Sequence, residues 1–248
     1  MNVVYILWLR QLKRSARSKA RIIGSFAQPL LYLLAFGFGF GSTFQRAGQG
    51  NYIQFLAPGI ITMSILFTSI FAGIEVIWDR QFGFLKETLV APVPRILIMV
   101  GRTLGGATVA VLQGMVVFGI CLIVGFRTPA LPLLPLAFTF MILMAVLFTA
   151  VGTALASILP DFQGFQLVMN FLVMPIFFLS GALFPLTNIP PAMRIIASLD
   201  PLSYGVDGLR FALIGVTHFG IPLDLAVLCA VTAAALAVGG YLFSRIQV

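Results

Sequence analysis

Residues 79–95 read DRQFGFLKETLVAPVPR, a short charged segment between two long apolar runs. Because both runs are of membrane length, the segment between them must lie in water or at a membrane surface. Phe82, Leu85 and Leu89 occupy positions i, i+3 and i+7, so they share one face of a helix that two prolines end downstream. A short amphipathic helix between two spans has the form of a docking surface for another protein. The alternative is an ordinary polar loop.

The composition around this segment predicts an integral membrane protein. The chain has 248 residues, of which 60% are hydrophobic and 9% are charged, and its mean hydropathy is +1.08. Since soluble domains carry roughly a quarter charged residues, this chain has too little polar surface to be soluble. Its net charge of +8 comes from basic residues that lie beside apolar runs. That placement favours contact with anionic lipid headgroups and predicts no nucleic-acid partner.

Residues 1–21 predict a basic amphipathic helix that lies in the membrane interface. Its basic face repeats at helical spacing and includes Arg10, Arg14 and Arg17. Trp8 lies on the opposite, apolar face and is typical of a residue that anchors a helix at this level of the bilayer. The alternative is a solvated basic tail that only sets the orientation of the chain.

Six runs are long and apolar enough to cross a membrane, since about 20 residues at 1.5 Å each span roughly 30 Å. The predicted spans cover about residues 22–42, 56–77, 100–126, 136–159, 165–184 and 225–243. Glu75 lies near the end of the second span, where an acidic residue is either functional or structural. In the structural case it lies at the interface or pairs with a nearby arginine, Arg80 or Arg102. Gly101 and Gly105 form a GxxxG pattern that permits close helix packing.

The segment 185–224 is too long for a turn and too apolar for a solvated loop, and within it residues 185–214 contain two short apolar helices, neither of which can span a bilayer. Pro190 and Pro191 can open one short helix, and Asp200 with the proline after it separates that helix from a second one. Two half-length apolar helices before a final span predict a re-entrant hairpin. Within the second helix Tyr204 is a candidate for the outward surface, and Asp207 and Arg210, at i and i+3, can pair.

The distribution of basic residues predicts the orientation. With six spans, eleven of the fifteen Lys and Arg residues fall on the side of both termini and of residues 79–95, and four fall on the other side. The positive-inside rule then places both termini in the cytoplasm and the hairpin on the outside.

Motifs for catalysis are absent from the sequence. It contains no GxxxxGK[ST], HExxH, CxxC or GxSxG, and its single histidine, His218, cannot build a metal site alone. The scattered acidic residues do not form the buried carboxylate chain of a proton-coupled pump. We therefore predict no enzyme activity and no cofactor in this chain, and expect another protein to supply energy for any transport.

Two stretches together resemble a known family. They are DRQFGFLKETLVAPVPR at 79–95 and NFLVMPIFFLSGALFPLTNIPPAMRIIASLDPLSYGVDGLR at 170–210. Their order and spacing are similar to those of the ABC-2 type permeases, the membrane subunits of bacterial ABC exporters, and in particular to the daunorubicin-resistance permease group. The resemblance covers the whole chain and implies an all-α integral membrane protein with six transmembrane helices in a single ABC-2 domain, residues 1–248.

The resemblance implies partners and residue roles as well. It implies two cytoplasmic ATPase subunits, which bind ATP and Mg, and a permease that pairs with a second copy or with a paralogous permease. Residues 79–91 would be the coupling helix that docks on the ATPase, and residues 185–214 would be the outward hairpin. On this reading the docking residues are Asp79, Arg80, Phe82, Leu85, Lys86, Glu87 and Leu89.

The expected function is ATP-driven export of an amphipathic drug, a lipid or a lipid-linked glycan across a bacterial inner membrane. One alternative is a self-sufficient secondary transporter or channel, which would need buried ion-binding groups or an inverted repeat. The other is a membrane assembly factor that transports nothing.

Overall fold

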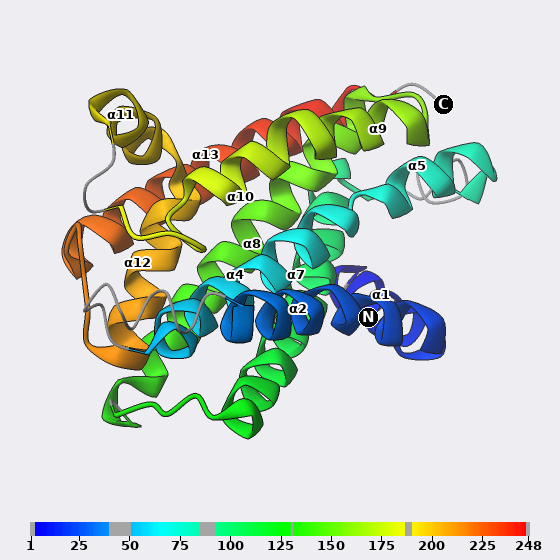
Figure 1. Cartoon of the computed structure of the whole chain (residues 1–248). Coiled ribbons are helices and arrows are strands. Elements are labelled where there is room, and N and C mark those ends of the chain that lie inside the picture. Colours follow the sequence, from blue (N-terminus) through cyan, green and yellow to red (C-terminus); the bar gives the residue numbers. More distant parts are fainter. Residues whose placement is uncertain (1–2, 40–50, 85–92, 130, 187–189, 247–248) are drawn as a thin grey trace.

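The computed structural model describes residues 3–39, 51–84, 93–129, 131–186 and 190–246, and these residues form a bundle of helices (Figure 1). No strand occurs among them. Five helical segments are long and apolar enough to cross a membrane: Tyr52–Gln81, Arg95–Val124, Leu131–Ile158, Phe162–Leu179 and Ile221–Ser244. They confirm a helical protein that crosses the membrane several times.

The first predicted span corresponds to α2 (Lys19–Gly39), whose apolar part, Ile23–Gly39, is shorter than the other five. Residues 40–42, at the end of the predicted span, lie outside the described residues. The count of six spans therefore stays a prediction. The helix before it, α1 (Val3–Arg17), is separate from α2 and carries the basic face.

The centre of the bundle is α4 (Tyr52–Phe71), whose side chains are mostly buried against α7 (Arg95–Val124) and α8 (Leu134–Ile158). Its continuation, α5 (Ile74–Gln81), starts after a break at Gly73. A Cβ atom at Gly73 would collide with the backbone of Gly152 in α8, so glycine lets the two helices approach closely here.

The fifth span is composed of three helical pieces, α9 (Phe162–Val168), the π-helical turn η2 (Met169–Val173) and α10 (Met174–Leu179). Asp161 begins α9 as its N-cap, because its Oδ1 accepts the backbone N–H of Gly164 at 2.7 Å. The cap starts the helix at Phe162, before the predicted start of the fifth span at residue 165. The last span is α13 (Ile221–Ser244).

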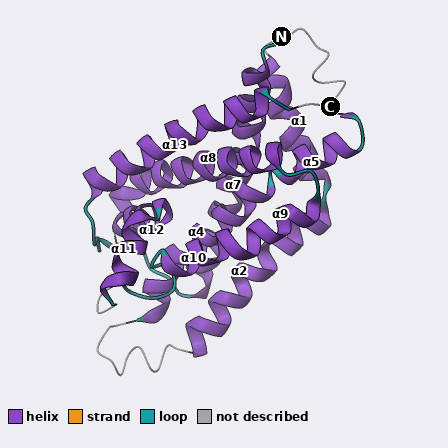
Figure 2. Ribbon diagram, turned by 90° about the horizontal axis from the view of Figure 1, so that it is seen from above, coloured by secondary structure: helices purple, strands orange, loops and turns teal. Residues whose placement is uncertain are grey.

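The two short helices of residues 185–214 lie where the prolines predict them, as α11 (Pro191–Leu199) and α12 (Pro201–Ile214). α12 is largely buried, whereas α11 exposes apolar side chains, including Ile195 and Leu199. Both views place α11 and α12 at the end of the bundle opposite to α1, α5 and the C-terminus (Figures 1 and 2). Whether the pair is re-entrant stays a prediction.

Candidate functional site

The candidate site is the end of the bundle where α1 meets α5 and α7. α1 packs along α7 at the predicted GxxxG, since Gly101 lies against Val4 and Leu7, and Gly105 lies against Gln11. Larger residues at either glycine would push α1 away. Trp8 completes this contact by donating from its indole N–H to the Thr108 hydroxyl at 3.0 Å. Trp8 is thus a packing residue of the α1–α7 contact as well as a part of the apolar face.

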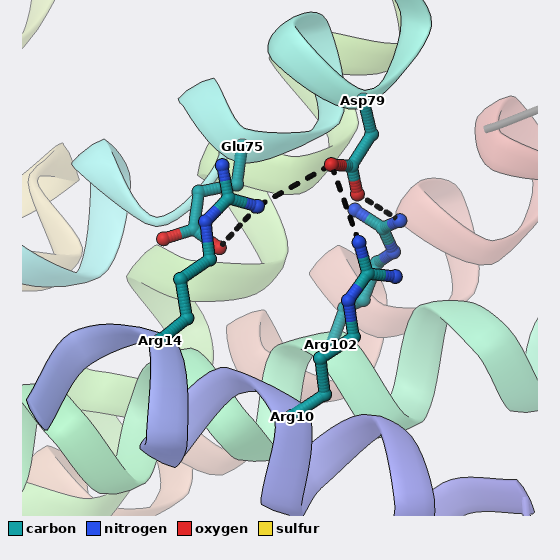
Figure 3. Close-up of polar contacts among 5 residues, drawn as sticks. All are labelled: Arg10, Arg14, Glu75, Asp79 and Arg102. Carbon is teal, nitrogen blue, oxygen red and sulfur yellow. Dashed lines mark hydrogen bonds and ion pairs between the residues drawn. The ribbon is translucent and has the colours of Figure 1, made fainter. Parts of the chain in front are cut away.

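A cluster of charged side chains fills the space between α1, α5 and α7 (Figure 3). We define the charge cluster as Arg10, Arg14, Glu75, Asp79 and Arg102. Arg102 of α7 donates from Nη2 to Oδ2 of Asp79 at 2.6 Å, and the Asp79 side chain is only 4% exposed. From α1, Arg14 approaches Oδ1 of Asp79 at 3.3 Å and Oε2 of Glu75 at 3.5 Å. Arg10 lies 3.5 Å from the same Asp79 oxygen.

The charge cluster holds three helices together. It combines three guanidinium groups with two carboxylates that are almost fully buried. Taking such charges out of water costs several kcal/mol per ion, so they are tolerated only when paired, and the loss of one partner leaves a charge uncompensated. The cluster therefore fixes α1 to the end of α5, although it adds little net stability over an apolar contact.

The pairings differ from those that the sequence predicts. Pairing of Glu75 with Arg80 or Arg102 was one expectation, and the described residues show an ion pair of Glu75 with Arg14 of α1. Asp79 was expected to contact another protein, but it is buried within the cluster. Both predictions missed the fact that α1 folds back onto the second span, which brings residues 65 positions apart in sequence together.

Arg80 points away from the charge cluster and toward the end of α8. Its guanidinium donates to the backbone carbonyls of Ala156, Ser157 and Leu159, each at 3.1 Å. These are carbonyls at a helix C-terminus, which lack partners within their own helix and carry partial negative charge. Arg80 therefore caps the C-terminus of α8. Its guanidinium is directed toward these carbonyls within the bundle.

The predicted docking helix is interrupted. α5 ends at Gln81, Phe82 is its C-cap, and Gly83 has a φ of 80°, a conformation that favours glycine. A single helix over residues 79–91 is thus wrong at its start, because Asp79 and Arg80 belong to the preceding span. The remaining predicted docking residues, Leu85, Lys86, Glu87 and Leu89, lie outside the described residues.

The end of α5 and the face of α1 enclose a groove of about 580 Å³. We call it the basic groove; it is lined by Tyr5, Ile6, Leu9, Arg10, Lys13, Arg14, Arg17, Asp79, Phe82 and Phe84. Phe82 is 73% exposed, and it lines the groove together with four cationic side chains. Exposed aromatic rings next to Arg and Lys are typical of a protein-binding surface.

At the opposite end, the candidate hairpin residues serve the fold. Asp207 accepts the hydroxyl of Thr217 at 2.9 Å and the backbone N–H groups of His218 and Phe219 at 2.8 Å, so it fixes the loop before α13. Tyr204 donates its hydroxyl to the carbonyl of Ser198 at 2.7 Å and thereby joins α12 to α11. Pro190 and Pro191 begin α11.

Arg210 does not form the predicted pair with Asp207. It donates to the carbonyl of Gly181 at 2.9 Å, and its guanidinium lies 4.1 Å from the centre of the Phe55 ring. Burial lowers the pKa of Arg210 to about 10, an effect that the negative charge of Asp207 opposes. Asp200 is also buried, and desolvation raises the pKa of its carboxyl to about 7. Within the described ranges, no three His, Cys, Asp or Glu side chains are grouped as metal ligands.

Comparison with known proteins places the chain among transport proteins. The family model described as ABC-2 type transporter matches residues 2–214. The transport permease ycf38 of Cyanophora paradoxa is 30% identical over 215 residues, which cover 84% of this chain and 73% of that protein. Nodulation protein J of Rhizobium leguminosarum bv. viciae is 29% identical, with 91% and 85% covered. The inner membrane transport permease YadH of Escherichia coli is 28% identical, with 90% and 87% covered.

Proposed function

Since this chain belongs to the ABC-2 type transporter family, as the two sequence stretches predicted, we propose that it is the permease subunit of an ATP-driven exporter. A separate ATPase subunit, present in two copies, binds ATP and Mg and docks on the end of α5. The exported molecule is an amphipathic drug, a lipid or a lipid-linked glycan. The chain itself carries out transport and not catalysis.

The observation that carries this proposal is the exposed Phe82 ring beside the basic groove. The Phe82 side chain is 73% exposed, so its ring is accessible as an aromatic anchor for a partner protein. The groove contributes four cations and one carboxylate, so it suits a partner with an acidic surface. The same end of the bundle carries the excess of positive charge, which supports a cytoplasmic location.

In this proposal the charge cluster transmits motion from the docking end, which is the end of the bundle where α1 meets α5 and α7. It joins α1 and α7 to α5 through the buried Asp79. When ATP draws two ATPase subunits together, the motion moves the end of α5, and the cluster carries α1 and α7 with it. The spans then rock as rigid bodies and open a path outward.

A second permease, either an identical copy or a paralogue, completes the path in this proposal. The fifth span supports this arrangement because Asn170 in η2 is exposed, and it accepts a 3.4 Å hydrogen bond from Gln166. Exposure of a polar side chain to lipid tails is unfavourable. Contact of Asn170 with a second protomer, or with a polar transport path beside η2, would be more favourable. π-helical turns often occur at functional sites.

The experiment that tests the proposal is reconstitution of the permease with its ATPase in lipid nanodiscs. Phe82→Ala is expected to reduce permease-dependent ATP hydrolysis at least tenfold, because an aromatic anchor at an interface contributes about 2 kcal/mol or more. Phe138→Ala is the matched control, since Phe138 is also exposed but lies near the start of α8. Equal hydrolysis by the two variants would refute docking at Phe82, and transport without any ATPase would indicate a secondary transporter.

A further inference from the structure

Asp200 alone joins α11 to α12. α11 ends at Leu199 and α12 begins at Pro201, so Asp200 is the C-cap of one helix and the N-cap of the other. Its backbone is extended, with a φ of −82° and a ψ of 114°, as expected before a proline. Hinges in proteins are often a few residues at the ends of helices that absorb changes in φ and ψ. A rotation at Asp200 would change the angle between the two helices and leave the interior of each intact.

The carboxyl group at this junction is buried. Asp200 is 6% exposed, and its Oδ1 accepts the backbone N–H of Leu202 at 2.8 Å, which caps α12. Its Oδ2 is buried and has no hydrogen-bond partner among the described residues. An ionised carboxylate with one oxygen shielded from water and left unpaired is unfavourable, whereas protonation removes the charge. The geometry therefore favours the neutral acid.

The elements packed around α11 and α12 offer few ionisable groups. They are α4, α8, α10, α13 and the short helix η1 (Leu131–Leu133). α8, α10 and η1 contain no ionisable side chain. At this end of the bundle, the ionisable side chains of the described residues are, besides Asp200, Tyr52, Arg127, Arg194, Tyr204, Asp207, Arg210, His218 and Asp224.

No cation in this set neutralises an ionised Asp200. Arg210 is engaged with the carbonyl of Gly181 and the ring of Phe55. Arg127 and Arg194 are exposed, and neither forms an ion pair with Asp200 in the part of the chain that the structure describes. Burial raises the pKa of Asp200 to about 7, against the opposing effects of the nearby Leu202 N–H and Ser203 hydroxyl.

α11 is held to the bundle by few buried contacts. Of its nine residues, only Ala197 is buried, and Leu199, next to the junction, is 77% exposed. A hydrogen bond from the Tyr204 hydroxyl to the Ser198 carbonyl, at 2.7 Å, ties it to α12. Both views show α11 at the edge of the bundle (Figures 1 and 2). Segments with so little buried surface open locally at low cost in free energy, whereas α12 is largely buried.

We propose that Asp200 is a proton-operated hinge between α11 and α12. With its carboxyl protonated, α11 packs on α12 as described. When the carboxyl releases its proton to solvent, α11 moves away from α12 and the carboxylate becomes hydrated; no other bond changes. Because the packed state holds the proton more tightly than the open state, packing of α11 is favoured at low pH and is lost as pH rises toward 7. The inference goes beyond the proposed function and depends on neither the ATPase nor a substrate.

Hydrogen exchange of the α11 amides tests the hinge directly. The permease is studied in lipid nanodiscs without any ATPase, and each rate is divided by the intrinsic exchange rate at the same pH. The opening of α11 should increase about tenfold from pH 5 to pH 6, because each opening releases one proton. It should level off above pH 7, where Asp200 is ionised in the packed state as well. Opening that stays constant from pH 5 to pH 7 would overturn the proposal.

The amides of α12 distinguish a hinge from general unfolding. Since α12 is largely buried, its exchange should stay slow at every pH of the series. If α12 exchanged faster with pH by the same factor as α11, the whole hairpin would be unfolding, and the proposal of a hinge would be wrong.

Asp200→Asn and Asp161→Asn form a matched pair. Both aspartates are N-caps whose Oδ1 accepts a backbone N–H, but Asp161 is exposed. Asparagine caps a helix equally well, so both variants are expected to fold. In Asp200→Asn the opening of α11 should no longer depend on pH, whereas Asp161→Asn should keep the wild-type response. A tenfold increase that persists in Asp200→Asn would contradict the proposal.

Tyr204→Phe separates the strength of the α11 contact from its pH dependence. It removes the hydrogen bond to the Ser198 carbonyl. The opening of α11 should become about fivefold more frequent at every pH, the effect of one neutral hydrogen bond, and the response to pH should remain. Loss of that response in Tyr204→Phe would show that Asp200 does not govern it. Because the ATPase is absent, none of these outcomes bears on docking at Phe82.

Discussion

Asp79 and Arg102 form a 2.6 Å ion pair between the last turns of α5 and the beginning of α7, with side chains that are 4% and 10% exposed. Two basic residues of α1, Arg10 and Arg14, contact the same carboxylate. The carboxylate of Asp79 therefore lies where three helices meet, at the end of the bundle that carries Phe82. This relationship makes Asp79 the residue on which the geometry of the docking end most depends.

Asp79→Asn should destabilise the protein, because it leaves the buried Arg102 without its charge partner. Breaking a buried pair costs about 3–5 kcal/mol, and the melting temperature in detergent should fall by roughly 6–20 °C. The control is Asp161→Asn, since Asp161 is an exposed helix cap and asparagine caps equally well. The double variant Asp79→Leu/Arg102→Met should regain most of the loss, and no recovery would contradict the pairing argument.

Arg14→Ala should loosen α1 without unfolding the bundle. Arg14 contacts both carboxylates of the charge cluster, so its removal weakens the link from α1 to α5. Hydrogen exchange of the α1 amides should become at least tenfold faster, because local opening then costs less free energy. Lys13→Ala is the control on the same helix, and equal acceleration in both variants would mean that the cluster does not hold α1.

Asp224→Asn should stabilise the protein. Asp224 is fully buried in the first turn of α13, and neither of its carboxylate oxygens has a hydrogen-bond partner among the described residues. Removing a buried charge without partners should raise the free energy of unfolding by about 1–2 kcal/mol, or the melting temperature by roughly 2–8 °C. Asp207→Asn is the matched control with the opposite sign, since Asp207 accepts hydrogen bonds from residues 217–219. A lower melting temperature for both variants would show that Asp224 has partners in the membrane.

The stability of the hairpin should fall as pH rises from about 4 to about 7. Burial raises the pKa of Asp200 from 3.8 to about 7, so the folded state holds its proton more tightly than the unfolded state does. This stabilisation is complete below pH 3.8 and is lost as pH rises through 7. Asp200→Asn keeps the cap on the Leu202 amide and should remove the slope between melting temperatures measured at pH 5 and pH 8. A wild-type melting temperature that rises over this interval would contradict the burial effect.

The helices of this fold could be predicted from the sequence because hydrophobic length and proline positions are local signals. The fifth span starts within a few residues of its prediction, and α11 and α12 follow the prolines at 190, 191 and 201. The largest error is at residues 79–91, where Gly83 interrupts the helix. The spacing of Phe82, Leu85 and Leu89 predicts a continuous helix, and it carries no information about the backbone conformation of Gly83, which has a positive φ.

The charge cluster could have been found in part. Arg10 and Arg14 are four residues apart, as are Glu75 and Asp79, so each pair lies on one face of its helix. Matching faces of opposite charge indicate a contact, but the sequence does not show which helices are neighbours. The cavity of about 430 Å³ that is lined by α1, α2, α4, α5, α7 and α9 could not have been predicted, because sequence spacing does not specify how six helices pack.

The most direct test of the central claim is a photo-crosslink from position 82. A benzoyl-phenylalanine in place of Phe82 changes an exposed ring into a larger exposed ring, and the same replacement at Phe138 is the control. We expect position 82 to crosslink to the ATPase subunit in the reconstituted complex and position 138 to give no such product. Crosslinks from position 82 to lipid alone, with the ATPase bound and active, would contradict docking at the end of α5.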